Sequence, residues 1–319
     1  MVMTTKEPMT MTIAFITHHD CTLHRVATHH PEVPERLAAI DDRMLASGLS
    51  MLLRHYDAPL VTREQLLRVH AEDYIDWVEA SAPGSGGMVC LDDGDTVMTE
   101  HTLQAARRAA GAVILAVDLV MGGEAKSAFC SVRPPGHHAE RARAMGFCIF
   151  NNIAVGAGHA LARHDLERVA VVDFDVHHGN GTEEIFRNEP RVIFCSTFQH
   201  PFYPFTGTEV DTDHIVGVPL ARGTTGTEFR EAVAEHWLPA LEAFRPQLMM
   251  ISAGFDAHRE EDMADFMLIE DDYAWVTRKL RDIALRHGEG RVVSCLEGGY
   301  ALSSLGRSAC VHVDALIGP

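Results

Sequence analysis

The feature that most restricts the fold of this chain is a repeated alternation of short apolar runs with longer amphipathic segments. Six runs rich in β-branched and apolar residues recur along the 319 residues, and the stretches between them carry apolar residues at three- to four-residue spacing. Such alternation is typical of strand–helix units, which build a parallel sheet covered by helices. We therefore predict an α/β fold with three layers and a central, mostly parallel sheet.

Glycine and proline residues punctuate the predicted elements. The strands cover residues 12–17, 127–132, 168–174, 191–198, 247–254 and 291–299, and the helices cover 102–121, 152–163, 228–244 and 271–287. No Pro/Ser-rich linker, low-complexity tract or internal repeat interrupts this order. We predict one catalytic domain over residues 1–319, with residues 1–11 flexible at its start.

The charge balance argues against a nucleic-acid partner. The net charge is −18 and no Lys/Arg run occurs, so basic peptides or small cations are the expected partners. The longest apolar stretch, residues 109–121, contains Asp118 and is too short to cross a bilayer, so we expect no membrane partner. The sequence leaves open whether the chain forms a homo-oligomer.

The cysteine pattern and the first residues favour a cytoplasmic protein. The seven cysteines are odd in number and include no Cys-x-x-Cys pair, which argues against a disulfide framework and against a thiolate zinc site. The opening MVMTTKEPMTMT has no basic start, sustained apolar segment or small-residue cleavage site, so it predicts no secretion signal. We expect most thiols to be reduced and buried.

Polar residues gather directly after four of the predicted strands. These strands run into DVHHGNG (175–181), RPPGHHAE (133–140), FDAH (255–258) and EGGY (297–300). Ligands of open α/β sheets bind outside the carboxyl ends of the strands. We therefore predict that the four segments form one site.

The stretch VVDFDVHHGNG (171–181) carries the strongest chemical signal. In an extended segment alternate side chains share a face, so Asp173, Asp175 and His177 would point together while Phe174 and Val176 point away. Two aspartates buried side by side cost free energy unless a cation or strong donors compensate them.

A metal ion is the compensation that these residue types favour. Asp175 and His177 supply two ligands, and Asp256 of GFDAH supplies a third from another strand end. Three protein ligands leave an open coordination position, which is typical of catalytic metal sites. The alternative is that Asp175 caps a turn and His177 is an ordinary loop histidine.

Two further strand ends suit acid–base chemistry. The adjacent His137 and His138 follow a rigid Pro-Pro-Gly turn, and a carboxylate such as Asp173 could orient one ring. Tyr300 follows two glycines and could donate its hydroxyl to a developing oxyanion. Taken alone, the histidines could be solvated loop residues. Together with a metal, these residues describe hydrolysis of an amide or ester.

Six segments, in order, resemble motifs of the histone deacetylase family. They are THHPEVPERL (28–37), RPPGHHA (133–139), GFCIFNNIAVGA (146–157), DFDVHHGNGT (173–182), SAGFDAH (252–258) and LEGGY (296–300). The resemblance is to bacterial class II-like members, the histone deacetylase-like amidohydrolases, and it implies the arginase–deacetylase fold. It also implies a zinc-dependent amidohydrolase that removes acetyl or other acyl groups from lysine or related amines by a metal-activated water.

The resemblance assigns the metal sites. Asp175, His177 and Asp256 would bind Zn²⁺, with Fe²⁺ as an alternative because carboxylate-rich sites do not select zinc strongly. Similar proteins also hold a structural K⁺ through residues that match Asp173, Asp175, His177 and Ser196.

The resemblance also assigns the acid–base residues. His138 would be the general base and acid, His137 paired with Asp173 would support it, and Tyr300 would polarise the acyl carbonyl. Position 180 is Asn, as in class II-like members, where other members have Asp. Because the hydrogen-bond partner of His138 is then an amide instead of a carboxylate, the imidazolium form of His138 is less favoured.

Three positions are compared with the residues that form the family's substrate channel. Phe147 and Tyr203 match the aromatic pair that walls the family's channel, although ordinary core packing is the alternative. Met263 stands seven residues after Asp256, where polyamine-selective members have a glutamate, so we expect acyl-lysine substrates to be preferred. Arg36 matches an arginine near the inner cavity for acetate, or forms a structural ion pair.

Three rival functions remain. An acetylpolyamine amidohydrolase would run the same chemistry on another amine, and the acidic charge suits it. An arginase-like enzyme with two Mn²⁺ ions would need more acidic ligands than GFDAH offers. A non-catalytic acetyl-lysine binder would have lost Tyr300, His138 or a ligand, and none of them is missing.

Overall fold

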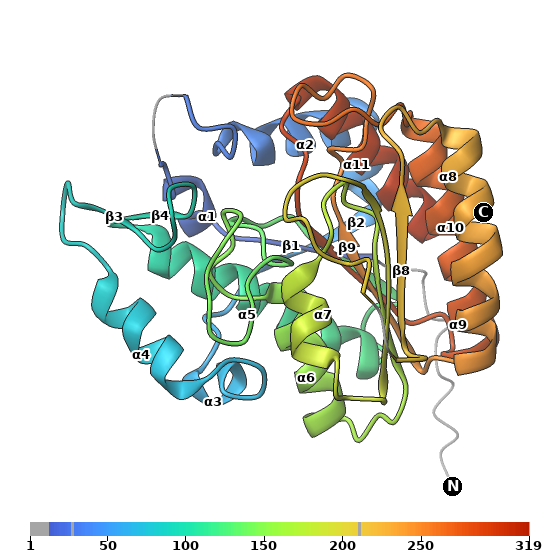
Figure 1. Ribbon diagram of the computed structural model, residues 1–319, viewed down its shortest axis with the longest axis horizontal. Coiled ribbons are helices and arrows are strands. Elements are labelled where there is room, and N and C mark those ends of the chain that lie inside the picture. Colours follow the sequence, from blue (N-terminus) through green and yellow to red (C-terminus); the bar gives the residue numbers. More distant parts are fainter. Residues whose placement is uncertain (1–12, 27–28, 210–211, 319) are drawn as a thin grey trace, which may run out of the picture.

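The structure is a computed structural model that describes residues 13–26, 29–209 and 212–318 (Figure 1). Residues 1–11, which the sequence predicts to be flexible, lie outside this range. So do residues 27–28, the second of which begins the first family-like motif. The single domain over residues 1–319 stays a prediction.

One eight-stranded sheet forms the centre of the described fold, in the order β2-β1-β5-β10-β9-β6-β7-β8. Every neighbouring pair in it is parallel. The strands are β1 (Ile13–Thr17), β2 (Leu53–Asp57), β5 (Ser127–Cys130), β6 (Val169–Asp173), β7 (Val192–Gln199), β8 (Ile215–Leu220), β9 (Leu248–Ala253) and β10 (Val292–Leu296). A separate antiparallel pair joins β3 (Met88–Cys90) to β4 (Val97–Thr99).

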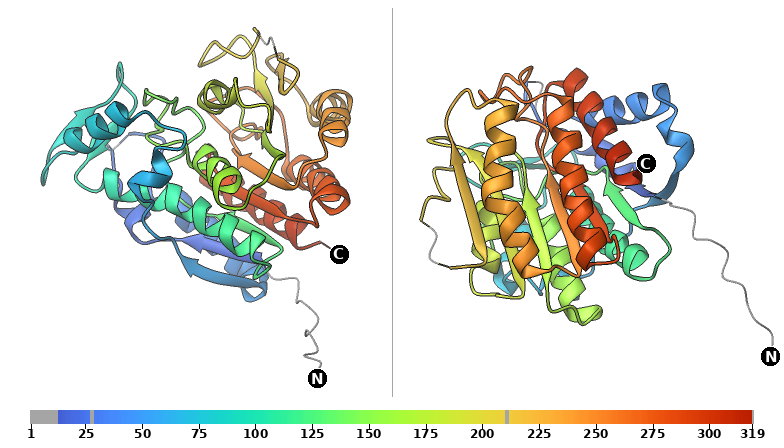
Figure 2. Two further views of the ribbon diagram at one scale, coloured as in Figure 1. Left: turned by 90° about the horizontal axis from the view of Figure 1, so that it is seen from below. Right: turned by 90° about the vertical axis from the view of Figure 1, so that its right-hand side faces the viewer.

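Helices cover both faces of the sheet, which confirms the predicted three-layer α/β fold (Figure 2). One face carries α2 (Glu35–Ala46), α8 (Gly226–Ala232), α9 (Leu238–Phe244), α10 (Glu270–His287) and α11 (Leu302–Ile317). The other carries α5 (Thr102–Met121), α6 (Asn152–Arg163) and α7 (Asn180–Phe186). The other helical segments include α1 (Asp20–Leu23), α3 (Arg63–Leu66), α4 (Glu72–Ser81) and the 3₁₀ turn Leu49–Leu52. No helix of the described residues is long and apolar enough to cross a membrane.

The predicted helix over 228–244 is one continuous rod with a π-helical turn, Val233–Trp237, in its middle. Pro239 follows this turn and has no N–H to donate. The N–H of Leu238 bonds to the carbonyl of Val233, five residues back. The wider turn therefore accommodates the proline without ending the helix.

Candidate active site

The four central strands bring the predicted segments together. In the register of the sheet Asp173 pairs with Ser252, Leu296 pairs with Ala253, and Cys295 pairs with Cys130. The segments that follow β6, β9, β10 and β5 therefore leave the same edge of the sheet side by side.

The three predicted metal ligands lie next to one another and are buried. His177 Nδ1 is 2.9 Å from Asp175 Oδ1 and 3.2 Å from Asp256 Oδ2. Backbone N–H groups satisfy the outer oxygens, because Gly298 N donates to Asp175 Oδ2 at 2.8 Å and Val176 N donates to Asp256 Oδ1 at 3.0 Å. Burial and the Asp175 carboxylate both raise the pKa of Asp256.

The backbone conformation that brings these ligands together differs from the sequence-based expectation. β6 ends at Asp173, and the chain bends through residues 175–177 instead of continuing as a strand. The predicted division of side chains still occurs, since Phe174 points away and its ring lies 6.0 Å from Phe255 and 5.7 Å from Tyr273. The bend, rather than strand alternation alone, turns Asp175 toward His177.

The two adjacent histidines face different partners. His137 Nδ1 lies 2.9 Å from Asp173 Oδ2, whereas His138 Nδ1 lies 2.8 Å from Asn180 Oδ1. Burial by itself lowers the pKa of His137, but the carboxylates of Asp175 and Asp173 outweigh it and hold that pKa well above its usual range. Burial and the neighbouring imidazoles of His137 and His177 instead lower the pKa of His138.

A narrow cavity of about 160 Å³ opens above these groups. Phe147 and Tyr203 stand on its walls, with Tyr203 5.3 Å from the His138 ring and Phe147 5.9 Å from the Tyr300 ring. The lining residues are Asp95, His138, Gly146, Phe147, His177, Phe202, Tyr203, Met263 and Tyr300. All three predicted channel residues are therefore in this lining.

Arg36 contacts both the Tyr300 ring and the backbone just before it. Burial raises the pKa of Tyr300 well above its usual range, while the guanidinium of Arg36, 4.8 Å from the ring centre, opposes this shift. Arg36 is buried, donates to the Gly299 carbonyl at 2.7 Å and pairs with Glu32 at 3.1 Å. It thus makes the structural ion pair and also contacts the tyrosine.

Several site residues were not predicted from the sequence. Phe202 stacks on His177 with 5.3 Å between ring centres, and its place in the aromatic run HPFYPF could have indicated it. Asp95 lies in the turn between β3 and β4, far from any strand end of the main sheet. Glu297 accepts the N–H groups of Gly136 at 2.6 Å and His137 at 3.1 Å, and burial raises its pKa to about 7.

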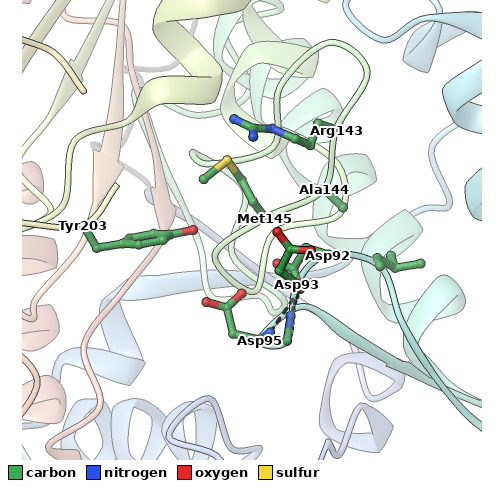
Figure 3. A pocket seen from close by; sticks show the side chains of 9 residues that line it. Asp92, Asp93, Asp95, Arg143, Ala144, Met145 and Tyr203 are labelled. Carbon is green, nitrogen blue, oxygen red and sulfur yellow. Dashed lines mark hydrogen bonds between the residues drawn. The ribbon is translucent and has the colours of Figure 1, made fainter. Parts of the chain in front are cut away.

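A wider cavity of about 560 Å³ adjoins the narrow one and shares Asp95 and Tyr203 with it. Figure 3 shows Asp92, Asp93 and Asp95 gathered on one side, with Tyr203 pointing toward them from the other. The Asp92 carboxylate accepts three backbone N–H groups of residues 94–96 at 2.9–3.0 Å. Three carboxylates and one guanidinium, that of Arg143, line this cavity, so the mouth of the channel is acidic on balance.

One further group of metal-type side chains occurs among the described residues, between the last turn of α5 and the end of α6: Asp118, His159 and His164. Asp118 Oδ1 lies 2.8 Å from Nε2 of both imidazoles. Arg68 donates to His159 Nδ1 at 2.5 Å, so a neutral His159 ring keeps its proton on Nε2, toward Asp118. That nitrogen has no free lone pair, and the group is a hydrogen-bonded network.

Comparisons with known proteins agree with this geometry. Residues 30–316 match the Histone deacetylase domain. The chain is 40% identical over 282 residues to the histone deacetylase-like amidohydrolase of Pseudomonas aeruginosa, an alignment that covers 86% of this chain and 73% of that protein. It is 35% identical over 328 residues to the polyamine deacetylase HDAC10 of Homo sapiens, across 97% of this chain and 48% of the human protein.

A solved structure has the same fold. The crystal structure of the HDA15 HD domain matches with a TM-score of 0.90 and 34% sequence identity, over 97% of this chain and 89% of that chain. The chain spans 20% of one curated relative and 99% of another, so some relatives are much longer than the region they share with it. The extent of the domain match and of the sequence identity shows that the chain belongs to the histone deacetylase family of metal-dependent hydrolases.

Proposed function

We propose that this chain is a zinc-dependent amidohydrolase that removes acetyl or other acyl groups from the ε-amine of lysine. One observation carries the proposal: the buried group of Asp175, His177 and Asp256 reaches a narrow cavity through His177, which lines that cavity together with His138. The His138 and His177 ring centres are 5.8 Å apart. A base and a metal-type ligand group thus face the same small space.

The ligand group fits a divalent metal ion. Asp256 Oδ2 is buried with no hydrogen-bond partner, although His177 Nδ1 is close to it. A Cβ added at Gly254 would lie 2.0 Å from Asp175 Oδ2, and one added at Gly298 would lie 2.0 Å from Asp256 Oδ2, so glycines keep this space open. A bound ion polarises an acyl oxygen and lowers the pKa of a water molecule. Zn²⁺ suits one nitrogen and two carboxylates, and Fe²⁺ is the alternative.

A second cation, K⁺, is part of the proposal. Ser196 pairs with Asp173 in the sheet, is fully buried, and its hydroxyl has no hydrogen-bond partner. An unpaired buried hydroxyl beside carboxylates is a suitable oxygen ligand for a hard cation. Ser196 would hold K⁺ together with Asp173, Asp175 and His177.

His138 would move the proton in the hydrolysis. When the neutral ring donates its Nδ1–H to Asn180, the lone pair stands on Nε2. His138 Nε2 would accept the proton of the attacking water and later deliver it to the departing amine nitrogen. His137, held by Asp173 on the other side, would stabilise charge without transferring the proton itself.

Tyr300 would bind the acyl oxygen. Because its pKa is raised, the phenol keeps its proton near neutral pH and can donate a hydrogen bond. A donor placed where negative charge develops contributes most in the transition state. Phe147 and Tyr203 would enclose the apolar stem of the acylated amine and exclude water from the reacting bond.

The second candidate function is an acetylpolyamine amidohydrolase. The acidic mouth formed by Asp92, Asp93 and Asp95 favours it, because a distant ammonium could bind there. Met263 at the rim favours acyl-lysine, since a thioether gives no ion pair. A competition assay of the zinc-loaded protein on acetyl-lysine peptides and N-acetylputrescine decides between them. If the protein hydrolyses neither substrate, the enzyme proposal itself is overturned.

We also propose a bacterial, cytoplasmic protein that binds no nucleic acid and could form a homo-oligomer. All seven cysteines are free and six of them are buried, which suits a reducing compartment. The net charge of −18 opposes nucleic-acid binding. Cell fractionation and light scattering of the purified protein test these points.

A further inference from the structure

The amide of Asn180 has to face one particular way for His138 to act as a base. With Oδ1 toward the ring, as here at 2.8 Å, His138 keeps its proton on Nδ1 and leaves the lone pair on Nε2. A flipped amide would present N–H groups to Nδ1 and would move the ring proton to Nε2. The flip exchanges one nitrogen for one oxygen in nearly the same volume, so packing alone does not select the orientation.

The hydrogen bonds that Asn180 Nδ2 donates, on the side of the amide away from His138, select this orientation. Asn180 Nδ2 donates to Glu140 Oε1 at 2.8 Å, which is a charge-assisted hydrogen bond. Its other acceptors are weaker, since the Met145 sulfur at 3.2 Å is a thioether and the His138 carbonyl is 3.5 Å away. A hydrogen bond to a charged group favours one of the two amide orientations by a factor of roughly ten to a hundred.

The Glu140 carboxylate is itself fixed. Arg143 donates to both of its oxygens, through Nε at 3.0 Å and a terminal nitrogen at 2.7 Å. The backbone supports the same geometry, because the Gly181 N–H donates to the His137 carbonyl at 3.1 Å. Glu140 and Asn180 line a cavity of about 400 Å³ that is distinct from the substrate channel, so Glu140 does not line the space for the acyl group.

We propose that Glu140 is a positioning residue for the hydrolysis: it holds the Asn180 amide with the oxygen toward His138 and thereby keeps the His138 proton on Nδ1. The inference rests on the proposed function, in which His138 is the base. It also explains why an amide suffices at position 180. A carboxylate there would accept the Nδ1–H with either oxygen, whereas an amide needs an acceptor behind it.

Glu140→Ala tests the inference first. We expect kcat to fall about twofold with little change in KM, because the two amide orientations become about equally populated and about half of His138 keeps the productive tautomer while the channel is intact. Zinc content and the thermal midpoint are measured alongside. The matched control is Glu184→Gln, at a residue that lines the same cavity and whose carboxylate accepts the Arg141 N–H at 2.9 Å. This control should keep the wild-type kcat.

A second experiment exchanges the amide at position 180 with the carboxylate at position 140. It distinguishes a positioning role of Glu140 from a merely structural one. Asn180→Asp alone places two carboxylates within hydrogen-bond distance of each other, and their repulsion should turn the new carboxylate away from His138 and lower kcat. The double variant Asn180→Asp/Glu140→Gln restores one donor and one acceptor in reversed order, since the glutamine amide can donate to the new carboxylate. We expect its kcat to recover at least tenfold over Asn180→Asp.

A spectroscopic measurement reports the tautomer directly. In ¹⁵N-histidine-labelled protein, two-bond ¹H–¹⁵N correlations distinguish a ring protonated on Nδ1 from one protonated on Nε2, and His138→Ala identifies the signal. Glu140→Ala should show the Nε2-protonated form beside the Nδ1-protonated form, whereas the wild type should show the Nδ1-protonated form alone. Wild-type kcat in Glu140→Ala, an unchanged tautomer, or no rescue by the exchange would each overturn the inference. An inactive wild-type protein would instead overturn the proposed function.

Discussion

The Glu261 carboxylate accepts the backbone N–H of Tyr300 at 2.8 Å. The same oxygen accepts the Ala301 N–H at 3.1 Å, at the start of α11. Glu261 belongs to the loop that follows Asp256, and Tyr300 follows β10. The Glu261 carboxylate therefore connects the loop after Asp256, a proposed metal ligand, to the backbone of Tyr300, the proposed oxyanion donor.

This contact predicts coupled effects at Glu261 and Tyr300. Tyr300→Phe should lower kcat about a hundredfold with zinc retained, because it removes a donor to the transition state. Glu261→Ala should lower kcat about tenfold by loosening the tyrosine backbone. Because Glu261 acts through Tyr300, the double variant should lose less than the product of the two effects. Steady-state kinetics of the four proteins measure the coupling.

Glu260 provides the control for this cycle. It is exposed, and its carboxylate pairs with Arg307 at 2.7 Å. Glu260→Ala should leave kcat close to that of the wild type. Fully multiplicative losses in the double variant would show that Glu261 acts elsewhere.

The metal assignment predicts that Asp256→Ala loses both zinc and turnover. The variant keeps Asp175 and His177 but removes the buried oxygen that has no hydrogen-bond partner. Metal analysis after dialysis and an acetyl-lysine assay provide the two measurements. Asp262→Asn, on the exposed part of the following loop, should keep both. A stoichiometric metal and a normal rate in Asp256→Ala would show the ligand set to be wrong.

The central strands could be predicted from the sequence and the edge strands could not. β6, β9 and β10 are buried along their whole length, so they read as continuous apolar runs. The edge strand β2, with the sequence LRHYD, has three exposed residues and resembles a loop. The helix α11 was also not predicted, although its buried face packs on α2 and α10.

The proposed site residues were predictable where they follow a strand, as Asp175 and Tyr300 do. Residues that act through contacts between separate segments gave no such signal. Glu140 reaches Asn180 across 40 positions, and Glu261 reaches Tyr300 across 39. Only the folded geometry shows these pairs, because no local spacing encodes them.

His70 predicts a pH dependence of stability. The ring is buried, accepts the Asn151 N–H at 3.0 Å, and burial lowers its pKa to about 4 from an ordinary 6.5. Since the folded-state pKa lies below the unfolded one, this stability is present above pH 6.5 and is lost as the pH falls toward 4. The loss amounts to as much as about 3 kcal/mol.

Denaturant unfolding at pH 7, 5.5 and 4 measures this effect. The free energy of unfolding of His70→Gln should fall less over this range than that of the wild type. His101→Gln, at an exposed histidine, should follow the wild-type curve. Parallel curves for His70→Gln and wild type would contradict the prediction.

Met263 predicts the order of substrates. Its side chain lines the narrow cavity with Phe147 and is 36% exposed, so it meets the substrate at the rim. A thioether contacts an apolar stem but forms no ion pair with a second ammonium. We therefore expect kcat/KM for an acetyl-lysine peptide to exceed that for N-acetylputrescine. Met263→Glu should shift the ratio toward the polyamine by about tenfold, since it adds a partner for the distant charge.

Two matched variants isolate the charge at this position. Met263→Gln adds polarity without charge and should shift the ratio much less than Met263→Glu. Met267→Glu adds the charge on the same loop, at an exposed residue outside the cavity lining, and should leave the ratio unchanged. If the wild type prefers N-acetylputrescine by tenfold or more, the acidic mouth at Asp92, Asp93 and Asp95 determines the substrate rather than Met263. The polyamine reaction then replaces the acyl-lysine reaction as the proposed function.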